Sequence, residues 1–213
     1  MILRRLLPLS GLVFVLVVVV AVVAIGGDTP SSGDAAQSMF DFYDEQSVRQ
    51  GIAAFVFAAS VPFIVLFAVG LAAAYREAGR ESAAVWRNVL IAGGILTGGA
   101  ILANSWIHFA LSDGADSGID PVALQSLVTL DSTSWVAFNA GLGVMMLGAA
   151  GCMIPGGSRF MGWAALVLGV ALFIPFADFF ALVLTLIWII VEGFMRYRDA
   201  TDAHRAARGI RPV

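Results

Sequence analysis

The sequence predicts an all-α integral membrane protein, a bundle of about six transmembrane helices with the last two short, and with short amphipathic helices in the two external loops. Three observations lead to this class. Hydrophobic residues make up 60% and charged residues 13% of the 213 residues, whereas soluble domains are about 45–50% apolar and about 25% charged. Several apolar segments are long enough to cross a hydrocarbon core of about 30 Å. Arginines also gather in alternate connections, as the positive-inside rule requires.

The first apolar run covers residues 6–25 and follows Arg4 and Arg5. Its length of about 20 residues suffices for one crossing of the bilayer, and we predict a retained first span at 1–26. A basic start, a valine-rich core and small residues near its end also suit a secretory signal peptide, which is the alternative interpretation.

An external acidic loop is predicted at 27–50, where acidic residues outnumber the single Arg49. Ser38 and Asp41 have the spacing of a helix start. The same segment contains the apolar and aromatic residues Met39, Phe40, Phe42 and Tyr43. We expect a short amphipathic helix here, lying at the membrane surface.

A five-span bundle is predicted at 51–195, beginning with a span at 51–75 that contains Pro62. Because proline lacks a backbone N–H and clashes with the preceding turn, Pro62 is expected to kink this span. A short charged connection follows, and the next span covers 88–111.

The span at 88–111 carries a stripe of small and polar residues. At about 100° per residue, its members fall within an arc of roughly 120°. They are Gly94, Thr97, Gly98, Ile101, Asn104, Ser105 and His108. In lipid, small residues let helices approach closely and polar residues need partners. The stripe is therefore expected to face protein, with Gly94 and Gly98 packing against another span of the same chain.

The second external loop is also acidic, with Asp113, Asp116 and Asp120. Asp120 and the following proline form a favourable N-cap and first helical position, which predicts a short amphipathic helix at 122–130. Residues 131–134 (DSTS) then supply caps for a separate span at 135–154.

The segment 161–195 is too long for one upright span, since a single helix would extend about 52 Å at about 1.5 Å per residue. Pro175 stops a helix and Asp178 can cap the next one. We predict two short spans, at 160–174 and 179–195, joined by a tight turn.

This arrangement places both chain termini on the cytoplasmic side of the membrane, with the tail 196–213 as an arginine-rich cytoplasmic segment. Only Arg49 would then lie outside. A single long helix over 161–195 would instead place the arginines of the tail outside, against the positive-inside rule.

Three segments carry a resemblance to a known family: 120–131 (DPVALQSLVTLD), 159–163 (RFMGW) followed by Gly169, and 186–188 (LIW). With these, the chain resembles a bacterial, actinobacterial-type family of small polytopic membrane proteins that is known only as a domain of unknown function. The likeness covers roughly residues 40–195 and implies a multi-span helical fold. The resemblance implies no particular substrate and no catalytic residues.

Four polar side chains are candidates for a ligand or proton site: Asn104, His108, Asn139 and Asp178. With the predicted topology all four lie in the outer half of the membrane, and intramembrane polar groups are functional candidates. The structural alternative is that the asparagines bond across helices, that His108 belongs to the interfacial belt and that Asp178 caps a helix. Ser105 and His108 share a helix face, but a nucleophile–base pair also needs a third orienting group, and none is evident.

Composition excludes several chemistries. All 12 basic residues are arginine, so a Walker A lysine or a lysine Schiff base is impossible. The one cysteine, Cys152, cannot form an intrachain disulfide, and the chain holds 2 histidines and no zinc-protease motif. We therefore expect no metal and no cofactor, and the net charge of −3 argues against a nucleic-acid partner.

These observations favour a membrane protein that binds a lipid, a small ligand or a partner membrane protein without catalysing a reaction. The first alternative is a component of a small-molecule or ion transporter that uses the outer polar site. The second is a membrane-embedded metal-dependent hydrolase, in which His108 and nearby carboxylates would have to bind the metal. The biochemical activity and the oligomeric state stay open at this point.

Overall fold

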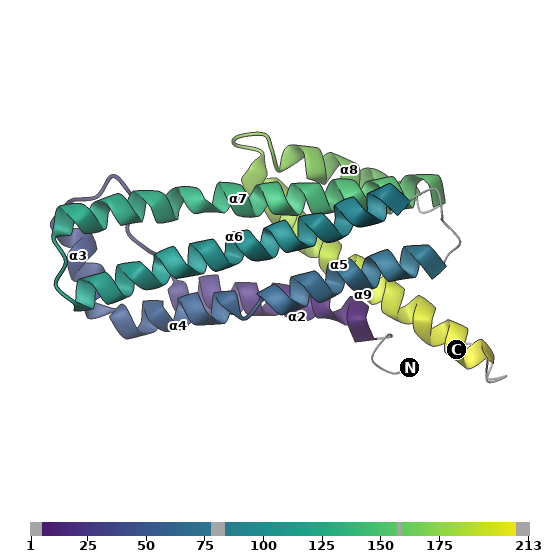
Figure 1. The fold of residues 1–213 in the computed structure, drawn as a ribbon, viewed down its shortest axis with the longest axis horizontal. Coiled ribbons are helices and arrows are strands. Elements are labelled where there is room, and N and C mark those ends of the chain that lie inside the picture. The colour runs from purple at the N-terminus through teal and green to yellow at the C-terminus, as the bar shows by residue number, and fades with distance from the viewer. Residues whose placement is uncertain (1–5, 78–83, 157–158, 208–213) are drawn as a thin grey trace.

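The computed structural model describes residues 6–77, 84–156 and 159–207, and every regular element in this part of the chain is helical (Figure 1). Five of its helices are long and apolar enough to cross a membrane. They cover Leu7–Gly26, Ser47–Arg76, Ala84–Asp116, Pro121–Met153 and Asp178–Asp202. The all-α class is therefore confirmed, and the five long apolar helices suggest a multi-pass membrane protein. The sixth apolar helix, Arg159–Ala171, is shorter than a full span.

The first hydrophobic segment is nearly continuous. A short 3-10 turn, η1 (Leu7–Leu9), leads into α2 (Ser10–Val19), which widens into a π-helical stretch, η2 (Val20–Gly26). Gly27 ends it with a φ of 67°, a left-handed conformation that glycine adopts without steric cost.

Pro62 breaks the second hydrophobic segment as predicted. The segment forms α4 (Ser47–Ala58) and α5 (Val61–Glu77), with a turn at Ala59 and Ser60 between them. Turn bonds from the Ser60 N–H to the Phe57 carbonyl and from the Phe63 N–H to the Ser60 carbonyl, 3.0 and 3.1 Å, bridge the break.

The two longest helices, α6 (Ala84–Asp116) and α7 (Pro121–Met153), run antiparallel side by side (Figure 1). Glycines bring their backbones together, since a Cβ atom built at Gly93 would lie 2.2 Å from the Met145 nitrogen and one at Gly141 would lie 2.5 Å from the Thr97 nitrogen. Gly94 and Gly98 instead contact Ala68 and Val61 of α5. The stripe on α6 therefore packs against protein, within the chain.

The structure has no helix break at 131–134, and the prediction of a separate helix at 122–130 is wrong. Both segments are part of α7. Asp120 does cap α7, accepting from the Val122 N–H at 2.8 Å. The hydroxyls of Ser132 and Ser134 donate to carbonyls three residues earlier, at 2.9 and 2.7 Å. Because these hydroxyls bond to carbonyls of the same helix, their hydrogen-bonding capacity is used without ending the helix.

The segment predicted as the first external loop contains a helix, α3 (Ala36–Glu45). Its apolar side chains face the ends of α6 and α7, where they form a small core separate from the main one. This core consists of Met39, Tyr43, Leu111, Ala115, Leu124 and Val128. Helix α3 thus covers the end of the α6–α7 pair, and its apolar face packs on protein where the sequence had suggested lipid.

The chain turns between α8 (Arg159–Ala171) and α9 (Asp178–Ala207), as Pro175 predicted. The prediction that both helices are short is wrong for α9, which has 30 residues. Glu192 and Arg196 lie one turn apart and form an ion pair of 2.6 Å, which supports the helix beyond the predicted end at 195. The start of η1 and the end of α9 lie at one end of the bundle, and α3 lies at the other (Figure 1).

Candidate functional site

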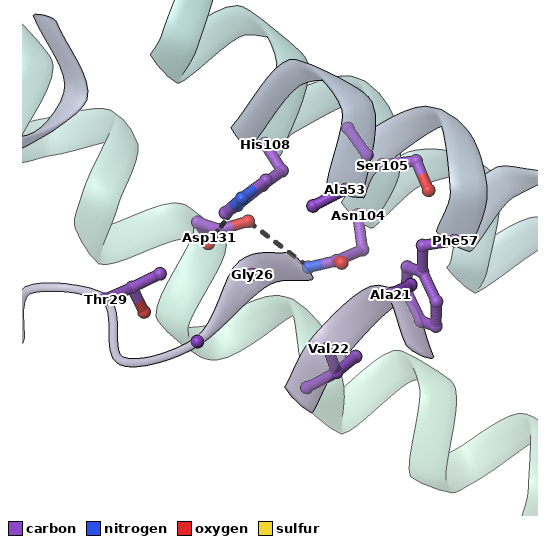
Figure 2. Close-up of a pocket in the computed structure, with 12 residues that line it drawn as sticks. Ala21, Val22, Gly26, Thr29, Ala53, Phe57, Asn104, Ser105, His108 and Asp131 are labelled. Atoms are coloured by element: carbon purple, nitrogen blue, oxygen red, sulfur yellow. Dashed lines mark hydrogen bonds and ion pairs between the residues drawn. The ribbon is translucent and has the colours of Figure 1, made fainter. Parts of the chain in front are cut away.

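A cavity of about 180 Å³ lies near the α3 end, between η2, α4, α6 and α7 (Figure 2). One wall is apolar and includes Ala21, Val22 and Phe57. The lining also includes the polar side chains Asn104, Ser105, His108 and Asp131. Mixed lining of this kind, apolar with a few converging polar groups, is typical of small-molecule sites.

His108 is held from both sides of its ring. Its Nδ1 lies 3.2 Å from Oδ2 of Asp131, and its Nε2 lies 3.0 Å from Oε1 of Gln50. Gln50 is fully buried and its amide nitrogen donates to the Gly26 carbonyl at 3.0 Å. Because a carbonyl only accepts, this bond fixes the Gln50 amide with its oxygen toward His108.

The bonds of His108 specify where protons lie. Gln50 Oε1 only accepts, so the ring nitrogen Nε2 carries a hydrogen. The contact between Nδ1 and Asp131 Oδ2 needs one more proton, either on the ring as a cation beside a carboxylate or on the carboxyl group itself. The pair is then electrically compensated in both forms. Its two residues belong to α6 and α7, so this contact links the two helices.

Asp131 is bonded through both oxygens. Oδ1 accepts from the Asn104 amide at 3.3 Å, and that amide also bonds Ser134 Oγ. Ser134 in turn donates to the Asp131 carbonyl at 2.7 Å. Figure 2 shows the Asn104 amide and the His108 ring pointing to Asp131 from the same helix. The Asp131 side chain is therefore held by two residues of α6, and neither of its oxygens is left without a partner.

Arg49 fastens η2 to the site. Its Nε donates to the Ile25 carbonyl at 2.5 Å and its Nη1 to Gln46 Oε1 at 3.1 Å. Gln50, one residue on, binds the next carbonyl of η2 at Gly26. These bonds use the carbonyls left free at the end of the first span, and they fix one wall of the cavity.

Ser105 has a different role, because its hydroxyl has no hydrogen-bond partner among the described residues although only 6% of the residue is exposed. It lines the cavity from α6. Buried polar groups in native proteins are nearly always bonded. An unpartnered hydroxyl in a cavity wall is therefore a point at which a ligand can bond.

Tyr43 of α3 covers His108 edge-on, with ring centroids 6.0 Å apart. Burial of the side chain, and then the negative charge of Asp131, raise the pKa of the Tyr43 phenol well above its ordinary value of 10.0. The unfolded chain therefore loses this proton at a lower pH than the folded protein does.

We expect the free energy of unfolding to fall as pH rises above 10, by about 1.4 kcal/mol per pH unit from Tyr43 alone. Below pH 10 both states keep the proton, so this group contributes no pH dependence there. The measurement is chemical unfolding of wild type and Tyr43→Phe between pH 9 and about 11. If the unfolding free energy falls equally steeply with pH in the two proteins, the raised pKa of Tyr43 is refuted. The other tyrosines are present in both proteins, so their contribution is removed when the two are compared.

The structure brings together two of the four predicted site residues, Asn104 and His108. Asn139 is buried on α7, and its amide atoms have no partner among the described residues, but it does not line the cavity. Asp178 accepts from the Phe179 N–H at 2.9 Å and lines a separate apolar hollow with Trp135. Sequence reasoning missed Gln50, and it took Asp131 and Ser134 only for helix caps.

The arrangement does not form a hydrolase triad. His108 has an orienting carboxylate in Asp131, but its other nitrogen bonds Gln50, and the Ser105 hydroxyl bonds no described residue. A triad needs a hydrogen bond from the nucleophile to the base. Among the described residues, no group of three or more His, Cys, Asp or Glu side chains is placed to hold a metal ion.

What the site can do is bind. The cavity combines apolar residues with polar side chains that are bonded to one another. The Ser105 hydroxyl, which bonds no described residue, can form a hydrogen bond to a ligand. Comparison of the chain with protein-family models, with curated proteins and with solved structures finds no match.

Proposed function

We propose that this protein spans a bacterial plasma membrane and binds a small uncharged polar ligand in the cavity beneath α3. The orientation follows from charge. Acidic residues gather at the α3 end, and they are Asp28, Asp34, Asp41, Asp44, Glu45, Asp113, Asp116 and Asp120. Arginines gather at the end with both termini, at Arg76, Arg87, Arg159, Arg196 and Arg198. The positive-inside rule then places the α3 end outside and both termini in the cytoplasm.

The bilayer is best placed between Trp135 and Met153 of α7, a length of about 28 Å at 1.5 Å per residue. The α8–α9 turn, with Pro175 and Phe176, lies beside Trp135, so α8 and its turn together extend across this same layer. Helices α6 and α7 each have 33 residues, about 50 Å, and their ends project beyond the layer with α3. The cavity lies at the boundary, where a ligand can arrive from water or from lipid.

One observation carries the proposal: the Ser105 hydroxyl is buried, has no partner among the described residues, and lies in the wall of a mainly apolar cavity that contains several polar groups. A volume of about 180 Å³ slightly exceeds the roughly 150 Å³ of an engineered cavity that binds benzene. A group of about that size, carrying a hydrogen-bonding function, fits the space.

The ligand is expected to be uncharged. In the wall, His108 and Asp131 bond each other at 3.2 Å, so neither is left to pair with an ionic ligand. An ionic ligand would lose its hydration without gaining an unpaired counter-charge, which is costly in a partly buried site. A neutral amide or hydroxyl loses less on entering and can bond Ser105.

Binding is favoured over transport by the packing below the site. Ile64, Phe67, Leu142 and Met145 are fully buried in the centre of the bundle, and close-packed side chains fill that centre. The same site in a transporter would need a second arrangement of these side chains.

The test is thermal unfolding of the purified protein in nanodiscs with three probes of equal size: propionamide, propionate and propylammonium. Propionamide is expected to raise the unfolding temperature saturably, because a ligand that binds only the folded state stabilises it by about 2.7 kcal/mol at a hundred times its Kd. Ser105→Leu, which fills the cavity, is expected to abolish this rise. The matched control Ser126→Leu, on the exposed face of α7, is expected to keep it. Equal responses to all three probes, or in both variants, would reject the proposed site.

A further inference from the structure

We propose that the ligand is amphipathic, with an uncharged polar head in the cavity and one apolar chain that passes between α4 and α6 into the bilayer. The inference rests on the proposed function, and it adds the class of ligand and its route of entry. Its basis is a second cavity on the lipid-facing side of the same two helices.

The second cavity has a volume of about 220 Å³ and lies between α4 and α6. Its lining is apolar apart from Ser105, and it consists of Ala54, Phe55, Ala58, Leu102, Ser105, Trp106 and Phe109. Phe55, Leu102 and Trp106 are 66%, 52% and 74% exposed, so this groove opens to the surroundings of the bundle. Its Leu102 end lies within the bilayer as placed above, so the groove opens to lipid there.

Two residues, Ala54 and Ser105, line both cavities. They form the boundary between the polar cavity and the lipid-facing groove, one from each helix. Both side chains are small, so only a thin wall separates the two spaces. The unpartnered Ser105 hydroxyl lies in this wall, where the head of a ligand would join its chain.

The break before Pro62 supports passage at this place. Helix α4 ends at Ala58, which itself lines the groove. Ala59 and Ser60 form a turn between the two helices, and the regular series of helix bonds is interrupted there. We therefore infer that α4 can move away from Ser105 with less displacement of α5 than a continuous helix would require.

The groove also sets the direction of the chain. Phe55 and Phe109 meet edge-on with centroids 5.2 Å apart, and they line both this groove and a more polar hollow nearer Asp113 and Asp116. The aromatic pair separates the apolar groove from that acidic end. An apolar chain that leaves Ser105 therefore runs toward Leu102, the side of the bilayer centre. A groove of this size takes one chain, since its volume is about one and a half times that of the benzene cavity.

The probe is a fatty primary amide whose acyl chain is brominated on the carbons near the head group, so that the bromine lies in the groove beside Trp106. It is compared with the fatty acid and the alkylamine brominated at the same positions. Bromine quenches tryptophan fluorescence on contact. The Trp106 signal is taken as the difference between wild type and Trp106→Phe in nanodiscs. We expect the amide to quench this signal saturably, at a concentration at least about tenfold lower than the other two probes, which corresponds to about 1.4 kcal/mol.

Two variants test the route. Ala54→Leu is expected to abolish the saturable quenching, and Ala92→Leu, an equal change at an exposed position of α6 that lines neither cavity, is expected to keep it. Ser105→Ala keeps the wall thin and removes the hydroxyl, so it is expected to raise the half-saturating concentration of the amide and leave the maximal quenching unchanged. Ala54→Leu thus tests passage, and Ser105→Ala tests recognition of the head.

The outcomes separate the two proposals. Quenching that rises linearly with each probe, and equally in Ala54→Leu, reports ordinary contact with lipid and overturns the inference. If propionamide still stabilises wild type in that case, the cavity binds a water-borne ligand and the proposed function stands. If propionamide also has no effect, both proposals fail.

Discussion

Replacing Gly141 by alanine is expected to lower the free energy of unfolding by more than about 3 kcal/mol, at the upper end of what overpacking costs. The added Cβ would lie 2.5 Å from the Thr97 nitrogen and 2.8 Å from the Thr97 Cα. These are backbone atoms, which cannot turn aside as a flexible side chain does. The substitution therefore forces α6 and α7 apart at a close backbone contact. The same argument holds for Gly148, whose Cβ would lie 2.3 Å from the Leu90 nitrogen.

Gly99→Ala is the matched control, because a Cβ there meets nothing within 4 Å although the residue belongs to the same helix pair. It is expected to be neutral or to stabilise by about 0.5–1 kcal/mol, the helix propensity gained over glycine. Chemical unfolding of the three proteins measures both effects. A Gly141→Ala protein as stable as Gly99→Ala would show that the close α6–α7 approach is not required.

This helix contact also decides how much of the site the sequence reveals. The stripe on α6 identifies Asn104 and His108 as inward-facing, because helical periodicity depends on one segment alone. Their partners depend on the register between segments. The glycine contacts align Gly93 with Met145 and Thr97 with Gly141, and the same register carried further along α6 places Asn104 opposite Ser134. The sequence of α6 alone does not predict this register with α7.

Sequence signals predicted helix interruptions correctly where they depend only on the local backbone. Pro62 interrupts its segment and Pro175 ends another, because a missing N–H and a ring clash act within one turn. The serine and threonine run at 132–134 is different, since such side chains either cap a helix or bond back within one. Tertiary packing decides between these outcomes, and here packing of Leu124 and Val128 under α3 favours one long helix. Gln50 gave no signal at all, since its role depends on reaching Gly26 and His108 at once.

At the opposite end of the bundle, replacing Arg196 by methionine is expected to cost about 3–5 kcal/mol of unfolding free energy. Glu192 is fully buried, and its Oε1 accepts from Arg196 Nε at 2.6 Å and from the Tyr75 hydroxyl at 3.2 Å. The guanidinium also lies over the Tyr75 ring, 5.0 Å from its centroid. Without Arg196 the buried carboxylate keeps one neutral donor and loses its counter-charge, and removing one partner of a buried pair is far more costly than removing both.

A double-mutant cycle tests this asymmetry. Glu192→Gln alone is expected to cost less than Arg196→Met, because the arginine side chain is long and can carry its charge to the membrane surface. The double variant is expected to recover most of the loss, since it contains neither charge, and Arg198→Met, exposed on the same helix, is expected to change stability by no more than about 0.5 kcal/mol. A double variant as unstable as Arg196→Met would mean that the arginine acts through its packing on Tyr75. The charge pair would then be dispensable, and α9 would be fixed to the bundle by the shape of its side chains alone.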